Sequence, residues 1–475
     1  MPYISIDNGN LYKAYYIRWF MNRMELKEII LEQNKTKTSE NLIRRDVFDK
    51  VEDYVKTSFI IIINGIRRSG KSTLLSQIRE KYDGYYLNFD DERFVKFTLE
   101  DFQAMYEIFI ELYGKKDFFY FDEIQNIKGW ERFVRRLHDE KKKVFVTGSN
   151  ASMLSRELGT HLTGRHLDIT LFPFSFNEFL ELKGLETSRF AFAQSPRFSS
   201  KVSKSNLDGA QEPEHAPEFI QRVLDIEKDS IYLIEKKSNI KRLFEDYFIK
   251  GGFAEYLKTE NKEYLKMLYD NILYRDIITR YNLSNESALK GLVYFISSNV
   301  AKEISFNSIK KLLNLGSSTT VKDYFDYLEN SFLAFIIPKF DYSLKKQIYA
   351  NKKMYLIDNA LAINLGFRIS EDLGRLLENM VFIELKRRRK EIFYFQEKNE
   401  CDFVIREGIK IVEAIQVCYD FNEENREREI NGLLEALRKF KLKEGLILTY
   451  DQEDEMKLEN KKINIIPVWK WLLDM

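Results

Sequence analysis

The feature that most constrains this chain is a glycine-containing loop that follows a short apolar run. Residues 65–72 read Gly-Ile-Arg-Arg-Ser-Gly-Lys-Ser and fit the pattern G-x-x-x-x-G-K-[ST]. Five apolar residues, Phe59–Ile63, lie just before it, and Thr73-Leu74-Leu75 opens a helical pattern after it. The sequence therefore predicts a buried strand, a tight loop and a helix, as in a parallel α/β sheet.

A loop of this kind surrounds phosphate groups with backbone N–H groups, and the following helix adds partial positive charge. Lys71 is expected to reach the β/γ-phosphates, and the Ser72 hydroxyl is expected to bind Mg²⁺. The alternative, a purely structural strand–helix turn, would leave those N–H groups unpaired. We therefore predict a site for ATP and Mg²⁺. The predicted contacts are Gly65, Ile66, Arg67, Arg68, Ser69, Gly70, Lys71, Ser72 and Thr73.

A second apolar run, Phe118–Phe121, ends in two acids, Asp122 and Glu123. Ligands of parallel sheets bind at the carboxyl ends of the strands. Asp122 is expected to hold Mg²⁺, and Glu123 to orient or deprotonate an attacking water. An acidic strand end could also simply cap a helix, but its position downstream of a phosphate loop favours the catalytic interpretation.

A third apolar run ends in Ser149-Asn150, and either side chain could sense a γ-phosphate or cap the next helix. We take Asn150 as the catalytic candidate. Arg156 and Arg165 follow it. An arginine can stabilise charge in phosphoryl transfer from its own chain or from a neighbouring subunit, although either arginine could be a surface ion-pair partner.

Composition excludes several classes of protein. Lys and Arg number 75 against 74 Asp and Glu, so no overall charge draws the chain to nucleic acid or to a membrane. Two cysteines, Cys401 and Cys418, exclude a disulfide scaffold, and the four histidines have no metal-ligand spacing. No apolar stretch approaches the roughly 20 residues of a membrane span, and no signal peptide is apparent. We therefore expect a soluble cytoplasmic protein with no membrane partner.

The predicted fold class is α/β: a P-loop parallel sheet, then a helical, winged-helix middle, then a smaller α/β module. At roughly 150 residues per domain, 475 residues suggest about three domains. The expected divisions are a helical lead-in at 1–40, the P-loop domain at 41–180, a helical lid at 181–260 with a flexible polar insertion at 186–217, a winged helix-turn-helix at 261–346, and an α/β module at 350–475.

The middle of the chain has a helix-turn-helix pattern. Ile304–Leu313 and Ser317–Asn330 are the two expected helices, and Phe332–Pro338 is the expected wing strand, followed by a short hairpin. The second helix offers Lys322 against three acids, a poor complement for DNA. A protein-contact role is therefore preferred over sequence-specific DNA binding.

Three acids in the last module form a candidate metal cluster. Glu378 lies on a predicted helix, whereas Asp402 and Glu413 lie on neighbouring predicted strands. This arrangement resembles the PD-(D/E)xK nucleases, whose acids bind Mg²⁺. We expect the three carboxylates to lie together and to raise at least one pKa unless a cation is present. They could otherwise be carboxylates on exposed strands.

The resembling nucleases carry a lysine two residues after the last acid. Here that position is Ile415, and if Gln416 takes the place of the acid it is Cys418. Lys410 or Lys398 could substitute. Without that lysine the resemblance implies a nuclease-like domain without cleavage activity.

Several segments together resemble one family. They are GIRRSGKST, FFYFDEIQN, VFVTGSNASML, LTGRHLDITLFPFSFNEFL and IKGGFAEYL. They resemble prokaryotic, archaeal-type AAA+ ATPases that carry a C-terminal winged helix and a restriction-endonuclease-like domain. From about residue 40 onward, the resemblance implies Walker A and Walker B motifs, ATP hydrolysis through Lys71, Ser72, Asp122 and Glu123, and Arg165 as the arginine finger.

Three functions compete at this point. The preferred one is an ATP-hydrolysing switch coupled to the C-terminal module, with a homo-oligomer supplying the finger. The second is a nucleic-acid-binding regulator that uses ATP as a structural ligand. The third is an ATP-gated nuclease that contacts DNA through its middle or last domain.

Overall fold

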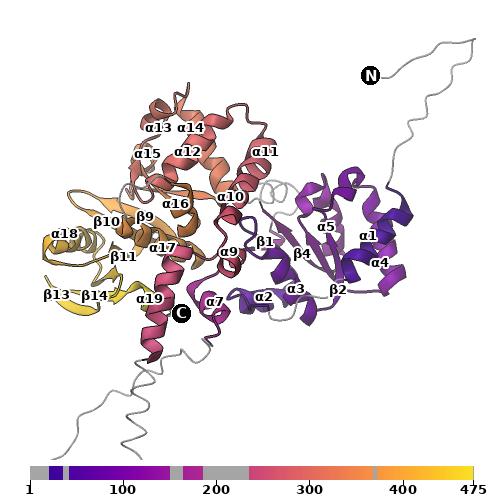
Figure 1. Cartoon of the computed structure of the whole chain (residues 1–475), viewed down its shortest axis with the longest axis horizontal. Helices are drawn as coiled ribbons and strands as arrows, with labels where there is room; N and C mark the ends of the chain where they lie inside the picture. The colour runs from indigo at the N-terminus through magenta and orange to yellow at the C-terminus, as the bar shows by residue number, and fades with distance from the viewer. Residues whose placement is uncertain (1–20, 36–41, 150–163, 186–234, 367–371, 474–475) are drawn as a thin grey trace, which may run out of the picture.

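The computed structural model describes residues 21–35, 42–149, 164–185, 235–366 and 372–473 (Figure 1). The predicted insertion at 186–217, Asn150 and Arg156 lie outside these residues. Within the described residues, no helix is both long enough and apolar enough to cross a membrane.

The first third of the chain forms a five-stranded parallel sheet in the order β2-β3-β4-β1-β5. Its strands are β1 (Ile60–Asn64), β2 (Gly84–Asn88), β3 (Phe118–Asp122), β4 (Lys143–Gly148) and β5 (His166–Thr170). The α/β fold class predicted from the sequence is confirmed. β5 was not predicted, because its sequence HLDIT is polar at three of its five positions.

Helices cover both faces of this sheet. Ile60 and Ile62 of β1 pack in the core on one face, beneath α1 (Arg23–Lys35), α4 (Asp101–Tyr113) and α5 (Trp130–Asp139). Ile61 and Ile63 pack in the core on the other face, beneath α2 (Phe48–Val55) and α3 (Lys71–Lys81). Because strand side chains alternate between faces, a strand of four isoleucines is buried on both sides.

Two short turns of 3-10 helix, η1 (Glu92–Lys96) and η2 (Ile124–Asn126), lie within the sheet domain. A series of helices then leads from β5 into a helical middle. They are α7 (Phe176–Leu182), a helix over 235–250, α9 (Ala254–Thr259), α10 (Lys262–Asn271), η3 (Ile272–Ile278), α11 (Thr279–Tyr281) and α12 (Glu286–Ser298). The segment η3 is a π-helix that continues directly from α10. A π-helical turn widens the backbone spiral and is frequent at functional sites.

The helix-turn-helix region contains α13 (Phe306–Leu312) and α14 (Ser318–Asn330), in the predicted ranges. The prediction of a short hairpin directly after them is wrong. β7 (Ala334–Pro338) pairs instead with β8 (Lys352–Leu356), and α15 (Leu344–Tyr349) lies between the two strands. β6 (Glu303–Ile304) completes a three-stranded sheet of order β6-β8-β7.

The last module is a six-stranded mixed sheet in the order β13-β14-β12-β11-β10-β9. Its elements are α16 (Asn359–Leu365), α17 (Leu373–Arg387), β9 (Glu391–Gln396), β10 (Glu400–Glu407), β11 (Lys410–Cys418), α18 (Glu423–Lys439), β12 (Glu444–Thr449), β13 (Asp454–Leu458), β14 (Lys461–Pro467) and α19 (Val468–Leu473). Strands β9, β10 and β11 form an antiparallel meander, and β12 adds in parallel to β11. β13 and β14 were missed by the sequence analysis.

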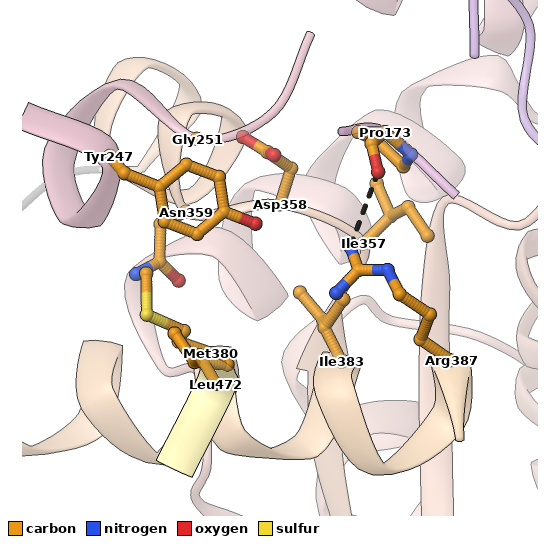
Figure 2. Close-up of a pocket in the computed structure, with 10 residues that line it drawn as sticks. All are labelled: Pro173, Tyr247, Gly251, Ile357, Asp358, Asn359, Met380, Ile383, Arg387 and Leu472. Atoms are coloured by element: carbon orange, nitrogen blue, oxygen red, sulfur yellow. Dashed lines mark hydrogen bonds between the residues drawn. The ribbon is translucent and has the colours of Figure 1, made fainter. Parts of the chain in front are cut away.

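The parts of the chain meet around a small cavity lined by both polar and apolar side chains (Figure 2). Asp358 accepts hydrogen bonds from the backbone N–H groups of Gly252 (2.7 Å) and Ala360 (2.8 Å). A Cβ atom on Gly251 would lie 1.9 Å from the Asp358 carboxylate, so this position requires glycine. Arg387 donates to the carbonyl oxygen of Pro173 (3.2 Å), which joins α17 to the end of the first domain. Burial raises the pKa of Asp358 to about 6.

Candidate nucleotide-binding site

The phosphate loop leaves β1 in a conformation that depends on glycine. Gly65 has φ +148°, and a Cβ atom there would lie 2.1 Å from the carbonyl oxygen of Leu171. Gly70 has φ +94° and immediately precedes α3. Left-handed backbone of this kind is costly for residues with a side chain. The loop therefore takes the strand–turn–helix path that the sequence predicted.

Lys71 lies inside the loop. Its ammonium group donates to the carbonyl oxygens of Gly65 (3.1 Å) and Ile66 (3.2 Å), and lies 3.6 Å from the Glu123 carboxylate. The side chain is buried. These three oxygens hold the ammonium group where phosphate oxygens would meet it in a loaded site.

Asp122 is fully buried at the end of β3 and accepts a hydrogen bond from the hydroxyl of Thr147. Burial raises the pKa of Asp122, and hydrogen bonds from Ser72 and Thr147 oppose that rise. The two predicted magnesium ligands, Ser72 and Asp122, therefore lie side by side. Thr147 was not singled out from the sequence, although it lies two residues before Ser149 on the same strand end.

Glu123 follows with a left-handed backbone, φ 50°. Its N–H donates to the Thr147 hydroxyl (2.9 Å), and Gln125 donates to its carboxylate (2.5 Å). Burial alone would raise the pKa of Glu123, but the charges of Lys71 and Arg67 and the Gln125 hydrogen bond bring it below its ordinary value. The carboxylate is therefore ionised at neutral pH, as a water-orienting base must be.

Buried polar atoms without a partner gather around this loop. Within the described residues, seven buried side-chain nitrogen or oxygen atoms have no hydrogen-bond partner. Four of them belong to Asn64, Ser69, Gln125 and Ser149, at the ends of β1 and β4 or beside the loop and Glu123. Such atoms are rare in folded proteins, because an unpaired buried polar atom costs free energy. Their concentration here indicates a place built for a polar ligand.

A buried arginine supports the loop from outside the sheet. Arg45 donates to the carbonyl oxygens of Ser69 (2.6 Å) and Phe172 (2.7 Å), and pairs with Glu178 (2.8 Å). Its guanidinium group thus ties the loop to the segment after β5. Nothing in the local sequence marked Arg45, because its partners lie 24 to 133 residues away along the chain.

The structure restricts the predicted role of Arg165. Its carbonyl oxygen accepts from the N–H of Ile60, and its guanidinium group pairs with Asp139 (2.9 Å). This is the amino end of β1 and β5, whereas the phosphate loop leaves the carboxyl end, four residues or about 13 Å further along the strand. The prediction that Arg165 acts in the site of its own chain is therefore wrong. A contribution from a neighbouring copy stays a prediction.

The loop is also held from the middle of the chain. The guanidinium group of Arg67 makes two parallel hydrogen bonds to the Asp276 carboxylate, both 2.9 Å. Asp276 lies on η3 and is 1% exposed. Its neighbour Arg275 pairs with Asp90, in the segment after β2. Of these two consecutive residues of the π-helix, Asp276 pairs with a cation of the P-loop domain and Arg275 pairs with an anion of it.

The carboxylates of the last module gather only in part. Lys353 of β8 bridges Glu378 and Asp402, with nitrogen–oxygen distances of 2.9 Å to each. Glu400 also contacts Lys353 (2.5 Å) and was not predicted. Burial, then the charge of Asp402, raises the pKa of Glu378 to about 8, although a cation is present.

The expectation that Glu413 joins this cluster is wrong. Glu413 pairs with Lys390 (2.7 Å) instead. Gln416, three positions further along β11, faces Asp402 and accepts from its N–H (3.3 Å). Residues three apart on a strand point to opposite faces. The fold therefore adopts the second alignment considered in the sequence analysis, in which Gln416 stands at the position of the last acid. The nearby cation is Lys353, in place of the suggested Lys410 or Lys398.

Comparison with known proteins gives matches along most of the chain. Residues 57–180 match a family described as AAA domain, and residues 241–372 and 373–471 match two families described as domains of unknown function, DUF8612 and DUF4143. The chain is 34% identical over 473 residues to the uncharacterized protein MJ1544 of Methanocaldococcus jannaschii, covering 94% of this chain and 95% of that one. An uncharacterized protein of Haemophilus influenzae is 27% identical over 449 residues, covering 90% of this chain and 98% of its own length.

Two solved structures show weaker likeness. AMPPCP-bound DnaA from Aquifex aeolicus is 16% identical with a TM-score of 0.22, over 60% of this chain and 86% of that one. A STAND ATPase with a tetratricopeptide repeat sensor, PH0952 from Pyrococcus horikoshii, is 13% identical with a TM-score of 0.25, over 73% of this chain and 46% of that one. Scores this low do not establish a shared arrangement of domains.

Proposed function

The chain belongs to the family of the archaeal protein MJ1544, and its own residues 57–180 match an AAA domain; from this premise we propose that it is an ATP-hydrolysing molecular switch. The observation that carries the proposal is the group of unpaired buried polar atoms around the phosphate loop. A triphosphate with Mg²⁺ offers acceptor oxygens and a cation to such a group.

Residues of the phosphate loop and of the end of β3 would each contribute a separate part of the chemistry. Lys71 would exchange two backbone carbonyls for β/γ-phosphate oxygens. Ser72 and Asp122 fit Mg²⁺, because both present oxygen atoms and lie together at the carboxyl end of β3. Bound Mg²⁺ would neutralise charge on the phosphates. Glu123, ionised beside Lys71, would orient the attacking water.

The switch itself would act through Arg67. A γ-phosphate carries negative charge close to this loop and would compete with Asp276 for the guanidinium group. Asp276 is almost fully buried, so losing its partner is costly unless η3 shifts. ATP binding would thereby be reported to the helical middle, and hydrolysis would restore the ion pair.

The remaining modules support an effector role. Helices α13 and α14 with strands β7 and β8 are consistent with a winged helix-turn-helix. The order α17, β9, β10, β11, α18 and β12 is consistent with a nuclease-like module. The acidic α14 disfavours DNA as the main partner. We propose that these modules bind a macromolecular partner in one nucleotide state.

The test separates binding from turnover. Lys71→Ala is expected to abolish ATP binding, measured by fluorescence of a labelled ATP analogue, because it removes the main phosphate cation. Glu123→Gln is expected to keep ATP bound while lowering hydrolysis by about 10²-fold or more, because it acts on the attacking water.

The matched control for the second variant is Glu107→Gln on α4, an about half-exposed acid that pairs with Arg23, which should leave both readouts unchanged. Near-normal hydrolysis by Glu123→Gln would contradict the assigned base. Unchanged ATP affinity in Lys71→Ala would contradict the site itself.

A further inference from the structure

A buried ammonium group lies among carboxylates where the three-stranded sheet meets the last module. Lys353 is 2% exposed. Its nitrogen lies 2.9 Å from Glu378, 2.9 Å from Asp402 and 2.5 Å from Glu400. Lys353 comes from β8, whereas the three acids come from α17 and β10. One residue of the middle region thus fills the centre of a site built by the last module.

The three contacts use the whole donor capacity of the lysine. An ammonium group has three N–H donors and no acceptor, and here three carboxylate groups receive them. Two of the carboxylates accept further hydrogen bonds from the protein. Tyr355 donates to the Glu378 oxygen that also contacts Lys353 (2.8 Å), and the N–H of Val417 donates to the second oxygen of Asp402 (2.9 Å). Protein groups therefore hold the Lys353 ammonium group and its carboxylates in place.

The same oxygen atoms are of the kind that a divalent cation takes. Carboxylate oxygens bind Ca²⁺ at about 2.3–2.6 Å and Mg²⁺ at about 2.0–2.1 Å. The Lys353 nitrogen lies at the centre of these three oxygens and leaves no room for an ion there. The lysine also does not stand at the strand position of a metal-assisting lysine, since Ile415 and Cys418 occupy the two positions available on β11.

We propose that Lys353 is the resident cation of this cluster, and that its tethered ammonium group takes the place of a divalent metal ion. The last module is then a metal-free binding module whose three acids hold a residue of the middle region. This goes beyond the proposed nucleotide switch and does not depend on it, because none of the four residues contacts the phosphate loop.

The proposal predicts that removing the tethered cation creates a metal site. In the full-length, nucleotide-free chain, Lys353→Met should bind one Mn²⁺ about tenfold or more tightly than its parent, since three carboxylates are then left facing one another. Adding Asp402→Asn should abolish that gain. All chains carry Asp122→Asn to remove Mn²⁺ binding at the phosphate loop. The readouts are Mn²⁺ titration by electron paramagnetic resonance and the thermal midpoint, which Mn²⁺ should raise in Lys353→Met alone.

Lys390→Met is the matched control, because Lys390 also bridges two acids, Glu407 and Glu413, but at the surface. It should gain no Mn²⁺ binding. Mn²⁺ binding by the parent that Asp402→Asn removes would overturn the proposal, and so would a folded Lys353→Met chain that gains none. If Lys353→Met does not fold, Lys353→Gln, which keeps two donors, takes its place, and the parent measurement remains decisive.

Discussion

Arg165 lies at the amino end of its strand, and this single placement decides how the catalytic site could be completed. The phosphate loop is at the other edge of the same sheet, so no side-chain rotation brings the Arg165 guanidinium group to its own nucleotide. Its present partner, Asp139, is half exposed and forms an ordinary surface ion pair. If Arg165 serves catalysis, a second copy of the chain must receive it.

Mixing two inactive variants tests that requirement. Lys71→Ala lacks a working loop but keeps Arg165, whereas Arg165→Ala keeps the loop. Each should hydrolyse ATP slowly alone, and the equimolar mixture should recover about a quarter or more of the normal rate, because the first variant supplies its arginine to the second. ATPase rates across protein concentration are the measurement. Asp139→Asn, which removes only the surface partner, is the control. Full activity of Arg165→Ala alone would exclude the arginine from catalysis.

At the scale of elements, the π-helix η3 is one of the contacts through which the sheet domain meets the rest of the chain. Arg275 and Asp276 are consecutive, yet they pair with residues from two different loops of the sheet, Asp90 and Arg67. The two pairs have opposite polarity, so the segment can dock in one register only. A nucleotide that draws Arg67 away breaks one pair and leaves the other as a hinge.

Asp276→Asn is therefore expected to raise ATP affinity, by about tenfold, because it frees Arg67 for the phosphates while keeping the side-chain shape. Isothermal titration with a non-hydrolysable analogue measures the change. Arg275→Gln is the control and should change affinity by less than about threefold, because its ion pair is partly exposed and does not include a residue of the phosphate loop.

A double-mutant cycle completes the test. If Arg67 is the carrier, Asp276→Asn should add nothing in an Arg67→Ala background. An equal gain in both backgrounds would show that η3 acts on the nucleotide by another route.

Most elements of the sheet could be predicted, because each one combines a local apolar run with a loop signal. The strands β1, β3 and β4 are of this kind, and so is helix α3. What the sequence could not supply was long-range pairing. The ion pair between Arg67 and Asp276 spans 209 residues, and no local pattern marks Asp276 or its pairing with the loop.

The same limit explains the candidate residues of the last module. Glu378 and Asp402 were found because a known spacing singles them out. Glu413 was chosen by spacing alone, but the backbone register directs Gln416 to the cluster instead. Lys353 was missed because it comes from a strand outside the pattern.

At the scale of the whole molecule, the junction in Figure 2 joins the parts of the chain through groups that titrate. Asp358 is fully buried and holds the N–H of Gly252, while Arg387 reaches the carbonyl of Pro173. Burial raises the pKa of Asp358 to about 6, and the two backbone hydrogen bonds and Arg387 limit the rise. The folded chain therefore binds a proton there more tightly than the unfolded chain does.

The sign of the resulting pH effect follows from linkage. A carboxyl whose pKa is raised on folding adds stability below its unfolded pKa, near 3.8, and loses that contribution as pH rises through about 6. The stability difference between the parent and Asp358→Asn should thus shift in favour of the parent by up to about 3 kcal/mol between pH 7 and pH 4. Urea denaturation at several pH values measures it. A pH-independent difference for Asp358→Asn would contradict the shifted pKa.

The position of Lys353 has a consequence for any attempt to separate the chain at the border between residues 372 and 373. The lysine belongs to the segment that ends at residue 372, and its three carboxylates belong to the segment that begins at residue 373. A cut between them would leave a buried cation in one piece and buried anions in the other, and neither piece could offset the charge by itself. A chimera joined at that border is expected to fold only if one parent protein supplies the lysine and the other supplies the carboxylates that pair with it. The two segments therefore depend on each other for charge balance, although sequence comparison separates them into two.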